Sequence, residues 1–494
     1  MPADWGEGKN YFLGNRKRYR IQAVFPVKLN VQELYEGGGP MQSYILYSVM
    51  ITSFVGAFVG SGINVALPAI GQEFAAGAGD LSRVSSAFLF GSAIFALPFG
   101  KVADILGRKK IYRLGAVFFS ITLIIGGFSQ SVEFLSGVRF LQGALMAMVF
   151  GPGTAMLVSV YDQSMRGRIL GYSTAAVYVG LTCGPVIGGL ICYYIGWRWF
   201  FYLAGGLASI GLIFLYQVKE EWYGDRGASF DYKGSLLYMA MVPLILYGLS
   251  EMSKQAIGVY LLIAGIICMI IFVVQERRTA QPMLEVGLFV GNRAFSFSNL
   301  AALMHYAATF AVTFLMSLYL QVVCGLTAPE AGGVLLLQFI VMAMLSPKAG
   351  ILSDRIAPGK VASVGMAINC ICLFVLSTLN EDSSLFLVGG ILMAVGVGYA
   401  LFTSPNNNAI MGAIDNRFYG IASSLLATMR LIGQAVSMAI VTIVIDVNEV
   451  KSLSGADNDG LLVAMTIIYR IFAGICLLGI WASLARNRDG EKQI

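Results

Sequence analysis

The chain has 494 residues, of which 57% are hydrophobic and 12% are charged, and its formal net charge is +6 at pH 7. Soluble domains have roughly 45–50% apolar and about 25% charged residues, so this chain has too little polar surface to cover a water-soluble globule. The composition excludes a soluble protein and predicts one whose solvent is lipid.

Apolar stretches long enough to cross a bilayer recur from Tyr44 almost to the end of the chain. A helix needs about 20 mostly apolar residues to cross roughly 30 Å of hydrocarbon, and it satisfies its own backbone hydrogen bonds there. The runs lack the ten-residue alternation of β-barrel strands. We therefore expect an all-α polytopic membrane protein with fourteen spans, at about residues 43–69, 83–104, 110–130, 133–159, 167–194, 197–217, 232–250, 256–275, 293–322, 329–353, 360–379, 383–411, 418–446 and 461–484.

The lysine and arginine residues predict how the chain sits in the membrane. With the N-terminus inside, 26 of the 33 basic residues fall in inside segments, four in outside segments and three within spans. Positive charge resists translocation, so we expect both termini to lie in the cytoplasm and the spans to lie in the cell membrane. The basic balance then implies contact with membrane lipids and needs no nucleic acid.

Residues 1–41 are polar and have no apolar core, so they form neither a signal peptide nor a span. Gly37, Gly38, Gly39 and Pro40 break the chain just before Met41. Two interpretations stay open: a short cytoplasmic tail, or a native start at Met41.

The segment from Gly100 to Lys110 reads GKVADILGRKK. It resembles the G-x-L-A-D-x-x-G-R-K/R signature between the second and third helices of the major facilitator superfamily. Gly100 and Gly107 permit a tight turn and close helix approach, and Asp104 and Arg108 can form charge-assisted bonds to helix ends. The resemblance implies that these residues hold an inner gate shut in the outward-open state. An ordinary basic loop would explain the cations but neither the aspartate nor the glycine spacing.

A degenerate copy of this segment, GILSDR, ends in Asp354 and Arg355, which we expect to act at the same gate. Its position implies an internal repeat with two extra spans between the halves. The expected organisation is a cytoplasmic tail at 1–41, a six-helix bundle at 42–217, a linker with two extra spans at 218–291, a second six-helix bundle at 292–485 and a tail at 486–494.

The fourth span carries Arg139, Gln142 and Gly143 in a string similar to the superfamily's R-x-x-Q-G motif. Burying an arginine costs at least about 2.5 kcal/mol on insertion scales, so a partner or a water-filled cavity is expected. The resemblance gives Arg139 and Gln142 a part in proton coupling. A structural arginine bonded to neighbouring carbonyl groups is the alternative.

The fifth span contains GLTCGPVIGG, which is similar to the motif that marks antiporters rather than symporters. Gly180, Gly184 and Gly188 line one helical face and let a neighbouring helix approach closely. Pro185 bends the segment, and Gly189 completes the motif. Export is therefore favoured over uptake.

Three further strings resemble the fourteen-helix drug/proton antiporter branch of the superfamily, and the resemblance covers about residues 45–485. They are NVALP from Asn64, GWRWF from Gly196 and SPNNNAIM from Ser404. This branch often has an acidic residue five positions before the asparagine of the first string, where this chain has Val59. The usual carboxylate for a proton or a cationic drug is therefore missing there.

Polar residues near mid-membrane are the other candidates for coupling and substrate binding. His305, the single histidine, could titrate near neutrality, but a neutral histidine bonded within the bundle is an equal alternative. Arg430 and Gln434 share a helical face, and with Arg139 they suit an anionic or zwitterionic substrate. The full set of expected cavity residues is Asn64, Tyr178, Tyr306, Gln338, Arg430 and Gln434.

The sequence has no phosphate-binding G-K-S/T loop, no H-E-x-x-H string and no nucleophile elbow, so we expect no enzyme activity, cofactor or metal. We predict a monomer that exports small molecules or drugs by alternating access, coupled to protons. The alternatives are export of an endogenous metabolite or lipid-like anion and, more remotely, a membrane sensor that does not transport.

Overall fold

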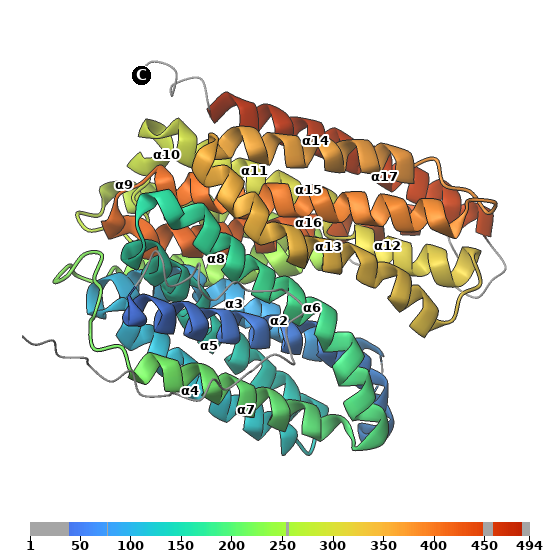
Figure 1. The fold of residues 1–494 in the computed structure, drawn as a ribbon, viewed down its shortest axis with the longest axis horizontal. Coiled ribbons are helices and arrows are strands. Elements are labelled where there is room, and N and C mark those ends of the chain that lie inside the picture. The colour runs from blue at the N-terminus through green and yellow to red at the C-terminus, as the bar shows by residue number, and fades with distance from the viewer. Residues whose placement is uncertain (1–38, 77, 253–255, 448–457, 487–494) are drawn as a thin grey trace, which may run out of the picture. The chain divides into compact units, whose positions relative to one another are not determined.

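The computed structural model describes residues 39–76, 78–252, 256–447 and 458–486, and every regular element in these ranges is a helix (Figure 1). Fourteen of the helical segments in these ranges are long and apolar enough to cross a membrane. The predicted fold class is therefore confirmed. Residues 1–38 of the predicted tail at 1–41 lie outside the described residues.

The first six spans form one bundle. They are α2 (Pro40–Phe74), α3 (Ala78–Leu106), α4 (Arg108–Gly127), α5 (Val132–Val160), α6 (Arg166–Tyr194) and α7 (Trp197–Tyr216), with the short turn η1 (Gln163–Met165) before α6. Within the bundle, α2 packs on α6 and α7, α5 packs on α3 and α4, and α4 packs on α7.

The last six spans form a second bundle with the same pattern of packing. They are α11 (Arg293–Thr309) continued by α12 (Val312–Leu318) and η2 (Tyr319–Val323), α13 (Ala328–Arg355), α14 (Pro358–Leu376), α15 (Leu385–Gly412), α16 (Tyr419–Val447) and α17 (Asn458–Ala485), with η3 (Asn416–Phe418) before α16. Here α11 packs on α16 and α17, α15 packs on α13 and α14, and α14 packs on α17. Each helix contact of the first bundle thus has a counterpart in the second, as an internal repeat requires.

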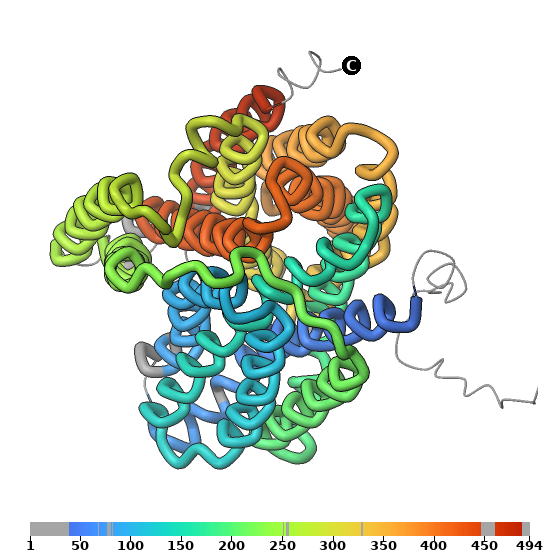
Figure 2. The backbone as a smooth tube through the Cα atoms, turned by 90° about the vertical axis from the view of Figure 1, so that its left-hand side faces the viewer, coloured from blue at the N-terminus to red at the C-terminus, as the bar shows by residue number. Residues whose placement is uncertain are grey.

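Two further spans, α8 (Tyr232–Glu251) and α9 (Ala256–Arg278), stand between the bundles in the chain, and the short α10 (Gly287–Gly291) leads into α11. Figure 2 shows this pair beside both bundles, reached by the segment 217–231, which crosses one end of the molecule. Gly258 and Gly265 of α9 face α8 so closely that a β-carbon would collide with it. α8 in turn contacts α3 and α16, one helix from each bundle.

Local sequence signals explain where the spans begin and end. Gly107 is the single residue between α3 and α4 and has φ 112°, and Gly196 has φ 97° between α6 and α7. Residues with a β-carbon rarely adopt this backbone region, so glycine allows these abrupt turns. Ser131 caps α5 by accepting a hydrogen bond from the backbone of Phe134.

Candidate functional site

Hydrogen bonds between the two bundles gather toward one end of the spans. This end carries the segment 100–110, and we call it the signature end. Within the part of the chain that the structure describes, the hydrogen bonds that join the bundles lie between the signature end and mid-span. The conformation is therefore closed at the signature end.

Asp104 and Arg108 form the first closing contact. Asp104 is fully buried and accepts a 2.7 Å bond from Nε of Arg108, which is 1% exposed. The other carboxylate oxygen accepts a 3.3 Å bond from the backbone N–H of Ile421, in the first turn of α16 in the second bundle. A carboxylate is stabilised by the positive end of a helix dipole, so Asp104 joins the bundles through the start of α16.

Arg108 adds two further contacts around this carboxylate. Its guanidinium donates to Oγ of Ser159 at 2.7 Å and across the interface to the carbonyl of Asn416 at 2.6 Å. Gly100 lies opposite Gly420 and Ser424, where a β-carbon would collide with the Ser424 side chain and stand 2.8 Å from the Gly420 carbonyl. Glycine at position 100 is therefore needed for α3 to approach α16 this closely.

The segment 217–231 covers the first closing contact, a role that was not predicted from the sequence. The backbone N–H groups of Gly224 and Asp225 donate to the Asp104 carbonyl, both at 3.0 Å, and Arg108 N–H donates to the Trp222 carbonyl at 2.8 Å. The carboxylate of Glu221 accepts from the backbone of Lys109 at 2.7 Å. These bonds fix the segment on the first closing contact, so it is more than a connection between the bundles.

Asp354 forms the second closing contact, at the equivalent position in the repeat. Its carboxylate accepts from the backbone N–H groups of Gly167 at 2.6 Å and Arg168 at 2.8 Å, in the first turn of α6 in the first bundle. Asn408 also donates to it at 3.2 Å. Arg355, which we had grouped with Asp354, is exposed, so the second contact depends on amide donors where the first has a buried ion pair.

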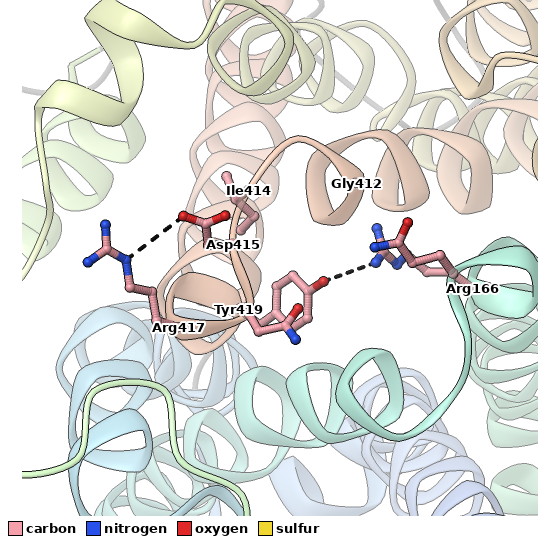
Figure 3. A pocket seen from close by; sticks show the side chains of 8 residues that line it. Arg166, Gly412, Ile414, Asp415, Arg417 and Tyr419 are labelled. Carbon is pink, nitrogen blue, oxygen red and sulfur yellow. Dashed lines mark hydrogen bonds and ion pairs between the residues drawn. The ribbon is translucent and has the colours of Figure 1, made fainter.

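A depression of about 500 Å³ lies where the two repeats meet at the signature end. It is lined by Gln163, Arg166, Gly412, Ile414, Asp415, Asn416, Arg417 and Tyr419. Figure 3 shows Arg166 reaching toward Tyr419, whose hydroxyl accepts a 3.0 Å bond from the guanidinium. The depression lies on the closed side of the molecule, away from mid-span.

Arg139 lies fully inside the first bundle and has neutral neighbours. It is 1% exposed and donates a 3.0 Å bond to Oε1 of Gln142, whose amide donates to the Thr122 carbonyl at 3.0 Å. Its guanidinium carbon lies 4.6 Å from the centre of the Phe88 ring. The structure thus brings Arg139 and Gln142 together, and no carboxylate forms an ion pair with Arg139 in the described residues.

His305 lies in the core of the second bundle and is fully buried. Its ring stacks on Phe402 at 3.9 Å between centroids and meets Tyr399 edge-on at 4.8 Å. Neither ring nitrogen has a hydrogen-bond partner among the described residues. The structure does not bring His305 to Arg139, which lies in the other bundle.

The glycines of the fifth span face α2. A β-carbon on Gly184 would stand 2.7 Å from the Phe58 carbonyl, and one on Gly188 would stand 3.4 Å from the α-carbon of Gly62. Gly180 faces the Phe54 carbonyl in the same way, Gly189 faces Val65, and Pro185 lies inside α6. Small residues thus bring the α2 and α6 backbones together within the first bundle.

A polar aromatic cluster lies near mid-span between the bundles. Tyr178 of α6 donates a 3.0 Å bond to Thr403 of α15, and Tyr306, Tyr399 and Arg430 are near enough to interact electrostatically with it. Two of these, Tyr399 and Thr403, were not predicted from the sequence. Aromatic side chains with one polar tip are typical of binding pockets, but their sequence pattern does not differ from that of a packed helix face.

The remaining cavity candidates are Asn64, Gln338 and Gln434. Asn64 is exposed and accepts a 2.8 Å bond from Ser85, and Gln338 is buried with its carbonyl oxygen unpartnered among the described residues. Gln434 is partly exposed, one turn from Arg430 on α16. Val59 is fully buried, and the acidic residues of the described spans lie near helix ends.

The end opposite the signature end is fastened within the first bundle. Glu73 accepts hydrogen bonds from Arg198 at 2.6 Å and from the Trp197 indole at 2.8 Å. The hydrogen bond from Arg198 holds the pKa of the Glu73 carboxyl below its usual value. No group of three or more His, Cys, Asp or Glu side chains in the described ranges could hold a metal ion.

The sequence matches a known family of membrane proteins over most of its length. Residues 49–438 match the model of the Major Facilitator Superfamily. The chain belongs to this superfamily. It is a multi-pass membrane transporter of small molecules. The closing contacts of Asp104 and Asp354 lie in the signature segment and in its repeat.

Several curated proteins resemble this superfamily member. It is 27% identical to the riboflavin transporter RibZ of Clostridioides difficile, over 91% of this chain and 98% of that protein. It is 30% identical to the multidrug resistance protein Stp of Mycobacterium tuberculosis, over 76% and 71% of the two chains. It is 26% identical to the tetracenomycin C resistance and export protein of Streptomyces glaucescens, again over 76% and 71%.

Among solved structures, the chain resembles the human organic anion transporter MFSD10 (TETRAN), with a TM-score of 0.65 and 14% sequence identity. The match covers 90% of this chain and 99% of that one. At this identity the likeness supports the fold of the superfamily member and nothing finer.

Proposed function

We propose that this transporter exports small molecules from the cell in exchange for protons by alternating access. The observation that carries the proposal is the pair of equivalent contacts, Asp104 to α16 and Asp354 to α6, that close the signature end. In a repeat-built transporter, such contacts form in one state and break in the other as the bundles rock. If the signature end is cytoplasmic, as the basic residues predict, the described state faces outward.

Export, rather than uptake, is supported by the glycine-rich contact of α6 with α2 at Gly180, Gly184 and Gly188. Several relatives are named for multidrug resistance or drug export, which agrees with this direction. We assign proton coupling first to the region of Arg139 and Gln142, which is buried and charged. His305 is the second candidate because it is a buried titratable group with unpartnered nitrogens among the described residues.

Export of an organic anion is the second candidate function. Arg430 lies beside the tyrosines of the mid-span cluster, and the described spans have no carboxylate at mid-span that would attract a cationic drug. The relative named as a riboflavin transporter also matches this chain over nearly its full length, so a planar heteroaromatic metabolite belongs among the test substrates.

Transport into inverted membrane vesicles tests both candidates. Vesicles with the transporter receive an imposed proton gradient and then a panel of lipophilic cations, organic anions and riboflavin. We expect gradient-driven accumulation of at least one compound, lost on collapse of the gradient. Accumulation that continues without a gradient would contradict proton exchange, and accumulation of anions alone would select the second candidate.

A further inference from the structure

Two acidic side chains lie buried together at the base of the inserted helix pair. Asp231 is the N-cap of α8 and is 8% exposed, and Glu276 lies in the last turn of α9 and is 2% exposed. They lie at the signature end, beside both bundles and outside the closing contacts. None of the motifs that resemble known families includes either residue.

Each carboxyl group has one partnered and one unpartnered oxygen. Oδ1 of Asp231 accepts from the backbone of Gly234 at 2.9 Å, and Oε2 of Glu276 accepts from the backbone of Leu284 at 2.7 Å. Oδ2 of Asp231 and Oε1 of Glu276 are buried without a partner among the described residues. The partnered oxygen of Asp231 thus caps the start of α8, and that of Glu276 binds the segment after α9.

The unpartnered oxygens face one another beside Gly234. A β-carbon at position 234 would collide with Oε1 of Glu276 and would stand 2.5 Å from Oδ2 of Asp231. The two carboxyl groups interact directly with each other. Glycine at 234 leaves the space in which they meet.

No cation balances this pair in the part of the chain that the structure describes. The charged side chains nearest to the pair along the chain are Arg226 and Lys233 around Asp231, and Arg277, Arg278 and Glu285 after Glu276, and all five are exposed. None of the ion pairs among the described residues includes Asp231 or Glu276. Two carboxylates this close and this buried repel strongly if both are ionised.

We propose that Asp231 and Glu276 share one proton and form a proton-binding site at the base of the inserted pair. One carboxylic acid donates its O–H to the facing carboxylate oxygen, which gives both orphan oxygens a partner.

This site is placed to influence how the bundles meet. Two turns along α8 from Asp231, the hydroxyl of Tyr238 donates to the Ala93 carbonyl of α3 at 3.1 Å and lies 2.6 Å from Oγ1 of Thr428 on α16. Tyr238 is 2% exposed and thus bridges the two bundles. Loss of the proton pushes the first turn of α8 away from α9, which weakens the placement of this bridge.

The test uses the purified full-length transporter in lipid nanodiscs. Wild type is compared with Glu276→Gln and Asp231→Asn, each of which replaces one acid by a neutral amide; asparagine is also a good N-cap. Glu285→Gln, an exposed acid on the same segment, is the matched control. Two properties are measured: the infrared band of protonated carboxyl groups at neutral pH, and the unfolding temperature from about pH 5 to about pH 7.

We expect the wild type and the control to show one protonated-carboxyl band that both amide variants lack. Because the folded wild type holds a proton that the unfolded chain has released, its stability falls as pH rises through this range. The amide variants lose this fall. A wild-type spectrum without the band, or an amide variant with the full wild-type slope, would overturn the proposal, and if one amide variant does not fold, the other decides. Neither readout depends on the transported substrate.

Discussion

The contact between Asp104 and Arg108 gives the sharpest prediction for the gate. Asp104→Asn keeps the shape of the side chain and removes its charge, so the buried guanidinium of Arg108 loses its partner. Removing one member of a buried ion pair costs about 3–5 kcal/mol. The bond from the Ile421 backbone across the interface also changes from a charge-assisted bond to a neutral one.

This cost falls on the closed form of the signature end. When the bundles separate there, water reaches Arg108 and replaces the lost partner, so the open form is affected much less. A shift of about 3 kcal/mol changes the ratio of closed to open forms by roughly 150-fold. The variant should therefore remain folded but should no longer close the signature end.

The assay measures the distance between spin labels on the two bundles at that end. Lys110→Cys and Lys360→Cys place labels at exposed positions of α4 and α14, in a background that lacks the seven native cysteines. We expect the short distances of the wild type to be replaced by long ones in Asp104→Asn. Asp415→Asn is the control, because that exposed carboxylate lies 4.0 Å from an exposed arginine. An unchanged distance distribution in Asp104→Asn would refute the gate role.

Three further predictions concern other parts of the molecule. Gly184→Ala should lower the unfolding temperature by overpacking α2 against α6, at a cost of about 1–3 kcal/mol. Gly206→Ala is the control, because Gly206 has open space around it. Equal effects of the two substitutions would refute the close approach of α2 and α6. Glu73→Gln should remove a small stabilisation by Arg198 that is present above pH 4.5 and is lost as pH falls through the lowered pKa of Glu73. If the unfolding temperature of the variant depends on acidic pH as that of the wild type does, this prediction is wrong. Finally, a membrane-impermeant thiol reagent added to intact cells should label Glu381→Cys and should label Lys110→Cys only after permeabilisation, and the reverse pattern would invert the predicted orientation.

The number and nature of the spans could be predicted from the sequence because long apolar runs have few alternatives in lipid. Asp104 and Asp354 could be found because their glycine and arginine neighbours form an unusual spacing that occurs twice. This spacing is a local pattern in the sequence. It does not indicate which helix of the other bundle each aspartate contacts.

Other contacts could not be predicted because they join residues far apart in the chain. The segment 217–231 reads as a polar connection, yet its backbone bonds to Asp104 and Arg108. Tyr399 and Thr403 lie in an apolar span, and only the approach of α6 gives them Tyr178 as a neighbour. Likewise, Asp231 and Glu276 are 45 positions apart and lie at the ends of two helices, so neither is conspicuous until the helices pair.

The central claim, export driven by protons, is tested most directly in reconstituted vesicles that contain a pH-sensitive dye. A substrate from the panel is added while a proton gradient is held across the membrane, and proton movement is followed in wild type, Asp104→Asn and Asp415→Asn. The account predicts substrate-dependent proton movement in wild type and Asp415→Asn, and its loss in Asp104→Asn. Substrate movement without any proton movement would contradict the coupling, and full activity of Asp104→Asn would contradict the gate.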